Sequence, residues 1–361
     1  MKNVKTIFKA VINAVIGLIL LGLYVLAVVN AYALYKGNLV LYATLLVVGI
    51  ILSTFLYSLI HELGHLIIGL MAGLKFSKIC VLCFLVEVEN GSLKFKIVKP
   101  TEFGYTEMLP KKVENYGKKL AVSATGGLVF SLACIVVSMV ICLNNLENIW
   151  LFTLFGACYP LAIYIFLINA LPLFDGSDGA LIFSVLLDGK NPSVLKNYYT
   201  ATASVMLSKE PSLLDGKLFE ISNESVYGQN LKYLNYLRYL STDFDKAYAE
   251  ILSLSKQNII DDNLYFIVKK ELFFCKVILG ENSFVQDNAS AVVGDIDLSE
   301  DLCNYRVHAS YRVFIKDYEF ASLILQNGLL VLSKKEQNGL VKSEIKYLNE
   351  LKNQLNNTQS L

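Results

Sequence analysis

Four long apolar segments with few charged side chains constrain what this chain can fold into more than any other feature. An α-helix needs about 20 apolar residues to cross the hydrocarbon layer of a bilayer, and each segment is long enough to do so. Only 17% of the residues are charged, against roughly 25% in a soluble domain. The sequence therefore predicts a polytopic α-helical membrane protein with about four transmembrane helices, at residues 10–35, 39–74, 120–143 and 149–171.

These segments divide the chain into three predicted domains. Residues 1–37 form an N-terminal transmembrane helix, whose apolar run exceeds the roughly 7–15 residues of a signal peptide, so we expect it to be retained. Residues 38–189 form the membrane core. Residues 190–361 contain no apolar run that could span a bilayer and are expected to form an all-α domain. The net charge of +1 creates no basic field that would attract nucleic acid.

The loop between the second and third segments predicts the orientation. Residues 75–119 carry nine lysines, while the other short loops carry one basic residue or none. By the positive-inside rule, this loop and both termini face the cytoplasm of a multi-pass protein of the cell membrane. The excess of lysine and asparagine over arginine indicates an AT-rich bacterial genome.

The same loop contains a signal for a small β-element. Alternating apolar and polar residues flank Asn90-Gly91 in the stretch FLVEVENGSLKFKIV. This dipeptide is typical of a two-residue type I′ turn, so the sequence predicts an interfacial β-hairpin at about residues 79–100.

Three ionisable residues lie inside the second apolar segment, in the sequence HELGH. His61 and His65 are four residues apart, so on a helix they project from one face and can share a metal ion. Glu62 is placed to act as the base that deprotonates a metal-bound water. The alternative is a buried histidine pair that forms hydrogen bonds between helices. Because ionisable groups at membrane depth are costly and mark functional sites, the sequence favours the metal.

A catalytic zinc site needs a third protein ligand and an open position for water. The remaining histidine, His308, lies in the C-terminal domain and is expected to be a surface or structural residue. Asp175 and Asp178 follow the fourth apolar segment, each directly before a glycine, and either carboxylate can supply the ligand. Considered alone, they would indicate a polar loop in which Asp178 caps the next helix.

Together these motifs resemble the site-2 protease family of zinc-dependent intramembrane proteases. HELGHLIIGLMAG, which begins at His61, is similar to the HExxH helix of that family. Asn169-Ala-Leu-Pro172 followed by Asp-Gly is similar to its second motif. SATGGLVFSLA at 123–133 resembles the small-residue helix between the two motifs, and Gly104-Tyr105 resembles its interfacial segment. The resemblance covers about residues 50–187.

The chain departs from the family in two places. The family's aspartate usually lies about eight residues after the asparagine, whereas Asp175 and Asp178 lie six and nine residues after Asn169. We prefer Asp178, because the apolar residues after it resemble the start of the family's next helix, and keep Asp175 as the alternative. The central helix has Gly126-Gly127 and Phe130 where the family often has Gly-Pro and an asparagine, so no role is carried over there.

The resemblance implies a zinc-dependent endopeptidase. His61, His65 and Asp178 would hold Zn²⁺, Glu62 would be the general base, and Asn169 would donate to the tetrahedral oxyanion. The substrate would be a membrane-embedded peptide or single-span protein in the lipid bilayer, cleaved in regulated intramembrane proteolysis or in peptide maturation. The hairpin edge near Asn90-Gly91 offers a place where an extended peptide could add as a strand.

The C-terminal domain contains a weak recurrence. The segments LSTDFDKAYAEIL, LGENSFV and IKDYEFASLIL begin at Leu240, Leu279 and Ile315. This spacing is close to the roughly 34 residues of a tetratricopeptide repeat, which consists of two helices. The domain is therefore expected to be a cytoplasmic, tetratricopeptide-like module that binds a protein partner, or an ordinary helical domain.

The rival to an enzyme is a catalytically inactive membrane adaptor. It would use the spans as an anchor and the helical tail as a binding platform. An intact HELGH sequence and the Asp-Gly motif favour the enzyme, because an adaptor has no need of them.

Overall fold

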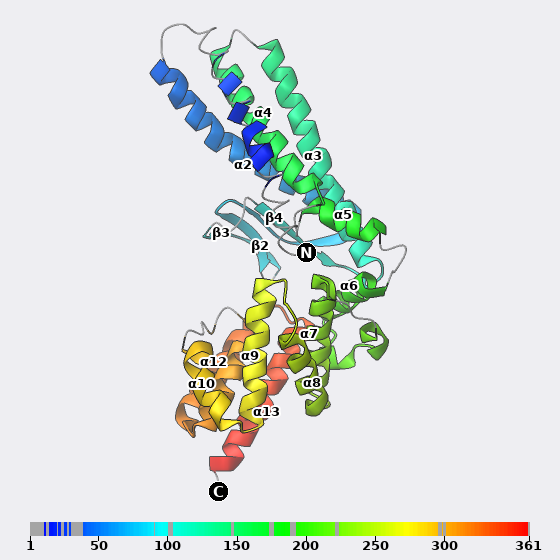
Figure 1. Ribbon diagram of the computed structural model, residues 1–361, viewed down its shortest axis with the longest axis vertical. Helices are drawn as coiled ribbons and strands as arrows, with labels where there is room; N and C mark the ends of the chain where they lie inside the picture. The colour runs from blue at the N-terminus through cyan, green and yellow to red at the C-terminus, as the bar shows by residue number, and fades with distance from the viewer. Residues whose placement is uncertain are drawn as a thin grey trace. The chain divides into compact units, whose positions relative to one another are not determined.

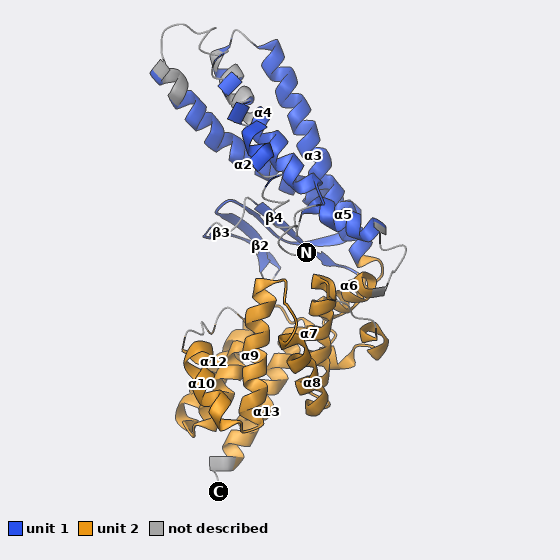
Figure 2. Cartoon of the chain, viewed as in Figure 1, with its two compact units in different colours: residues 1–111, 117–189 blue, residues 112–116, 190–361 orange. Residues whose placement is uncertain are grey.

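Figure 1 shows the computed structural model of the chain. The structure describes residues 39–89, 91–99, 104–145, 148–172, 177–187, 193–220, 224–294, 298 and 301–359, and of the N-terminal segment residues 11, 14–19, 21–22, 25–26 and 29. Most of the described chain is helical, with one small antiparallel sheet. Two compact units are present, residues 1–111 with 117–189 and residues 112–116 with 190–361 (Figure 2). The predicted N-terminal transmembrane helix lies largely outside the described residues.

The long apolar segments of the first unit form helices. These are α2 (Leu39–Met71), α3 (Tyr116–Asn144), α4 (Ile149–Ala170) and the shorter α5 (Asp178–Leu187). Among the described residues, Thr44–Met71 and Tyr116–Asn144 are long and apolar enough to cross a membrane, and the apolar stretch in α4, Tyr159–Ala170, is shorter. Bilayer insertion and the four-span topology stay predictions.

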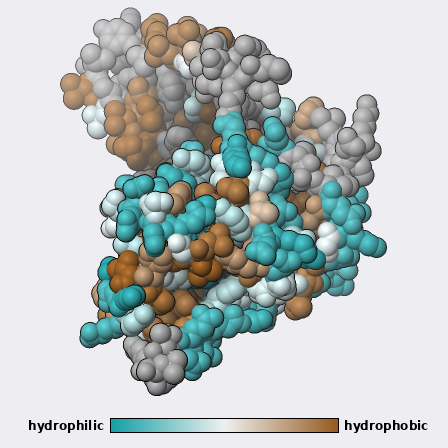
Figure 3. Space-filling view, turned by 60° about the horizontal axis from the view of Figure 1, so that its bottom comes forward, coloured by the Kyte–Doolittle hydropathy of each residue, from teal (hydrophilic) through white to brown (hydrophobic). Residues whose placement is uncertain are grey.

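Apolar side chains are exposed along α2 and α3. They include Val47, Ile51, Leu52, Val129, Val136 and Val137. In Figure 3, the described residues at the upper end of the view are mainly hydrophobic, whereas hydrophilic and hydrophobic residues are interspersed over the nearer part.

Helices α2 and α3 cross at a pair of glycines. A Cβ atom added to Gly64 or to Gly126 would lie closer to the other residue's carbonyl oxygen than van der Waals contact allows. Small residues allow helix backbones to approach this closely. The crossing brings the histidine-bearing turns of α2 against α3.

The sheet lies between α2 and α3 in the chain and has the strand order β3-β2-β1-β4, with all neighbours antiparallel. Its strands are β1 (Leu74–Val81), β2 (Phe84–Glu89), β3 (Ser92–Ile97) and β4 (Gly104–Pro110). The predicted hairpin is confirmed as β2–β3, because Glu89 pairs with Ser92 across a two-residue turn in which Gly91 has φ +77°. The sheet is larger than predicted, since β1 and β4 extend the hairpin on one side.

The second unit is helical. Its elements are α6 (Ser193–Met206), the 3₁₀ turns η2 (Pro211–Leu213) and η3 (Gly216–Phe219), α7 (Val226–Leu240), α8 (Phe244–Ser255), α9 (Asp262–Ile278), α10 (Asn282–Val293), α11 (Asn304–Phe314), α12 (Tyr318–Lys334) and α13 (Gly339–Gln359).

Each recurrent sequence segment falls on the turn between two packed helices of this unit. The pairs α7–α8, α9–α10 and α11–α12 are each joined by a three-residue connection. An acidic residue precedes the second helix of each pair, namely Asp243, Glu281 and Asp317. The recurrent segments therefore correspond to three helical hairpins. The likeness to tetratricopeptide repeats stays a prediction.

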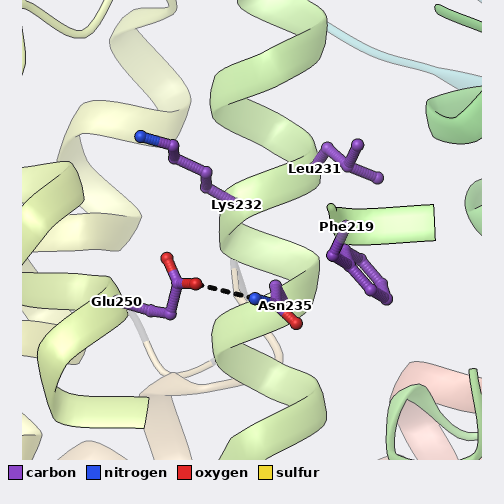
Figure 4. Close-up of a pocket in the computed structure, with 5 residues that line it drawn as sticks. All are labelled: Phe219, Leu231, Lys232, Asn235 and Glu250. Carbon is purple, nitrogen blue, oxygen red and sulfur yellow. Dashed lines mark hydrogen bonds between the residues drawn. The ribbon is translucent and has the colours of Figure 1, made fainter. Parts of the chain in front are cut away.

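A small hollow of about 30 Å³ lies between α7 and α8 (Figure 4). Its lining residues are Phe219, Leu231, Lys232, Asn235 and Glu250. Asn235 Nδ2 donates to Glu250 Oε1 at 2.7 Å, so these polar groups already satisfy each other. Ligand pockets usually measure roughly 300–1,000 Å³, and we interpret the hollow as a contact between two helices.

Candidate metal centre

The helical form of α2 brings the two histidines of HELGH together. His61 and His65 lie one turn apart, and their Nε2 atoms are 3.1 Å from each other. Only 4% of His61 is exposed, and His65 is half-buried. Two imidazole nitrogens therefore point at one place in an otherwise apolar helix.

Asp178 brings a carboxylate to the same place from α5. Its Oδ2 atom lies 3.2 Å from Nε2 of His61 and 3.3 Å from Nε2 of His65. Asp178 is the first residue of α5, but it does not cap the helix: the amide of Ala180 donates to Ser177 Oγ at 3.2 Å. Ser177 thus satisfies the helix end and leaves the Asp178 carboxylate free for the histidines.

Steric crowding explains why a glycine follows Asp178. A Cβ atom on Gly179 would overlap the carbonyl group of Ala170, where the end of α4 passes the start of α5. The Asp-Gly pair therefore combines a ligand-type side chain with a residue that permits this close approach.

The three donor atoms fit a zinc ion. Two ligands bound to tetrahedral zinc at about 2.0–2.1 Å lie about 3.3–3.4 Å apart, and the three edges here measure 3.1, 3.2 and 3.3 Å. Asp178 Oδ2 is buried and, apart from its contacts with the two Nε2 atoms, accepts no hydrogen bond from the described residues, although a buried carboxylate oxygen normally has a partner. A shared cation would satisfy all three atoms, and the cluster could bind a metal.

Glu62 lies beside this cluster and is held by the sheet. It is close enough to His61, His65 and Asp178 to interact electrostatically with all three. Thr106 of β4 donates from Oγ1 to Glu62 Oε2 at 2.7 Å. A Cβ atom on Gly104 would lie 2.9 Å from Glu62 Oε1, so the glycine leaves that second oxygen uncovered.

The Nδ1 atoms of both histidines contact α3. His65 Nδ1 lies 3.1 Å from the carbonyl oxygen of Ser123, and His61 Nδ1 lies 2.9 Å from Ser131 Oγ. We did not predict these contacts, or that of Thr106, from the sequence. The one available signal was the four-residue spacing of Ser123, Gly127 and Ser131 within the small-residue helix.

Two other predicted site residues, Asn169 and His308, make different contacts. Asn169 Nδ2 donates to the carbonyl oxygen of Ile165 at 3.0 Å, one turn earlier in α4, and its role towards an oxyanion stays a prediction. Asp175 lies outside the described residues. His308 lies in α11 of the second unit, where Arg312 Nε donates to its Nε2 atom at 3.3 Å.

No family model matches the chain, and neither a curated protein nor a solved structure is significantly similar to it. A function for this chain can therefore be argued only from the geometry of the site and from the sequence motifs that resemble the site-2 protease family.

Proposed function

We propose that this protein is a zinc-dependent intramembrane endopeptidase whose site is similar to that of the site-2 protease family. The observation that carries the proposal is the triangle of donor atoms from His61, His65 and Asp178, with Glu62 beside it. A purely structural histidine pair would need neither a buried carboxylate at both of its Nε2 atoms nor a second carboxylate next to it.

Each residue of the site has a separate role in the proposed hydrolysis. Zinc held by His61, His65 and Asp178 would acidify water and polarise a peptide carbonyl. Glu62 accepts a proton from the attacking water as its oxygen bonds to the carbonyl carbon, and delivers that proton to the amine nitrogen as the C–N bond breaks. Because Thr106 contacts Oε2 and Gly104 leaves Oε1 uncovered, we assign the transferred proton to Oε1. Asn169 is the candidate donor to the oxyanion.

The substrate would be a transmembrane or membrane-associated peptide, because the centre lies on an apolar helix that could span a bilayer. Such a peptide must unwind locally before attack, since a helix hides its carbonyl groups in hydrogen bonds. The protein would be multi-pass with both termini in the cytoplasm, and the second unit would bind a protein partner there.

Metal analysis tests the centre directly. We expect the full-length chain in detergent to hold about one zinc ion, and Asp178→Asn to lose it. Asp175→Asn and His308→Gln are the matched controls and should retain zinc. Zinc retained by Asp178→Asn and lost from Asp175→Asn would move the ligand to Asp175. A wild-type chain without zinc would favour the membrane adaptor instead.

Cleavage of a tagged single-span membrane protein tests the reaction. We expect Glu62→Gln to retain zinc and lose cleavage, because an amide cannot accept the proton of water. Glu87→Gln makes the same change on β2, where Glu87 pairs with Lys96, and should leave both properties intact. Cleavage by Glu62→Gln at the wild-type rate would remove Glu62 from the mechanism.

A further inference from the structure

We propose that α3 positions the two histidines of the candidate metal centre, and that the hydroxyl of Ser131 is the side-chain group that sets how tightly the centre holds a divalent metal ion. The inference rests on the proposed metal centre and assigns residues that tune it. It does not depend on which substrate is cleaved.

His65 is held by main-chain atoms. Its Nδ1 atom lies 3.1 Å from the carbonyl oxygen of Ser123, which can only accept, so Nδ1 carries the hydrogen and, in the neutral ring, Nε2 carries the lone pair. In return, Ser123 Oγ donates to the carbonyl oxygen of His65 at 2.8 Å. Because the backbone carbonyl survives any substitution of Ser123, the fold itself fixes the tautomer of His65.

His61 depends on a single side chain. Its Nδ1 atom lies 2.9 Å from Ser131 Oγ, and only 2% of Ser131 is exposed. When His61 presents its Nε2 lone pair to a metal, Nδ1 must donate to this hydroxyl. Removal of the hydroxyl leaves a buried N–H group without a partner and frees the ring to turn.

Gly127 lies between the two serines and makes their contacts sterically feasible. Residues 123, 127 and 131 are four apart and therefore share one face of α3. A Cβ atom on Gly127 would lie 2.6 Å from Cε1 of His65 and 2.8 Å from Cε1 of His61. With hydrogen at this position, both rings can lie against the helix while the serines hold their Nδ1 atoms.

Ser138 provides a matched control on the same helix. Its Oγ lies 2.7 Å from the hydroxyl of Tyr57 on α2, and it is as buried as Ser131. The two serines therefore make the same kind of link between α2 and α3, but only Ser131 contacts a candidate ligand.

The test is a zinc titration of the full-length chain in detergent, in competition with a chelating dye. Loss of such an outer contact typically weakens metal affinity about 10–100-fold, and we expect this of Ser131→Ala. Ser131→Thr, which keeps the hydroxyl, and Ser138→Ala should stay close to wild type. With Co²⁺ in place of zinc, the absorption spectrum at saturating metal should change in Ser131→Ala and not in Ser138→Ala.

Wild-type affinity in folded Ser131→Ala would overturn the inference and leave the proposed function standing. An equal loss in Ser138→Ala would also overturn it, because the effect would then belong to helix packing. Should Ser131→Ala fail to fold, Ser131→Gly carries the same expectation. A wild-type chain that binds neither metal would overturn the metal centre itself.

Discussion

At the scale of single residues, Gly127 decides how closely α3 approaches the two histidine rings. We expect Gly127→Ala to abolish stoichiometric zinc binding, because the added methyl group would meet ring atoms of both His61 and His65. Alanine otherwise stabilises a helix by about 0.5–1 kcal/mol relative to glycine. Loss of zinc from a variant that stays folded would therefore be caused by the contact with the rings and not by a weaker helix. Gly17→Ala is the control, since a Cβ atom at Gly17 would meet no atom of the described residues within 4 Å. Zinc analysis and thermal unfolding in detergent measure the outcome, and full zinc occupancy in Gly127→Ala would contradict it.

Single residues also show which parts of the site the sequence predicted and which it did not. The sequence singled out His61 and His65 because their spacing lies within one helix, and Asp178 because the resemblance pointed to it. Thr106 and Ser131 were missed because each contact joins two elements, β4 to α2 and α3 to α2. A threonine or serine in an apolar surrounding carries no local sign of such a partner.

At the scale of elements, the sequence predicted those helices and turns whose pattern lies within one continuous stretch of residues. An unbroken apolar run predicted α2, and a two-residue turn predicted the hairpin β2–β3. The pairing of β1 with β4 was missed, because it joins Leu74 to Pro110 and contains an irregularity between Phe76 and Lys78. Such pairing depends on the close approach of distant segments, which a periodic pattern does not encode.

The hairpin has one apolar and one charged face, and this division leads to a prediction. Leu93, Phe95 and Ile97 of β3 are 70%, 62% and 73% exposed. The residues between them, Lys94 and Lys96, form ion pairs with glutamates of β2. Because successive residues of a strand point to opposite faces, the apolar face is expected to contact lipid.

Fluorophores attached at neighbouring cysteines in liposomes test this arrangement. A label on Phe95→Cys should be quenched by nitroxide-bearing lipid, and a label on Lys94→Cys should be quenched by aqueous iodide. Iodide quenching of both labels to the same extent would show that neither face of β3 meets the bilayer.

At the scale of the whole molecule, a buried ion network connects helices of the second unit that are far apart in sequence. Arg306 of α11 donates to Glu271 of α9 at 2.9 and 3.1 Å and to Glu344 of α13 at 2.9 and 3.0 Å. Tyr236 of α7 donates to Glu271 at 2.7 Å. Burial disfavours the charge of Arg306, yet attraction by Glu271 and Glu344 raises its pKa well above the ordinary value. One guanidinium thus compensates two carboxylates inside the unit.

Removal of this guanidinium should loosen the second unit as a whole and leave the first unit unchanged. Breaking a buried ion pair by deleting one partner typically costs about 3–5 kcal/mol, and Arg306→Ala would leave two buried carboxylates without a cation. We expect hydrogen exchange of the full-length chain to accelerate in α7, α9, α11 and α13 together, with no change in α2 and α3. Arg312→Ala is the control, because Arg312 lies on the same helix but is 29% exposed, and it contacts Asp317 and His308. Ion pairs that water reaches contribute only about 0–1 kcal/mol. Acceleration confined to α11 in Arg306→Ala would mean that the network fixes one helix rather than the unit, since cooperative unfolding exposes all of its members at once.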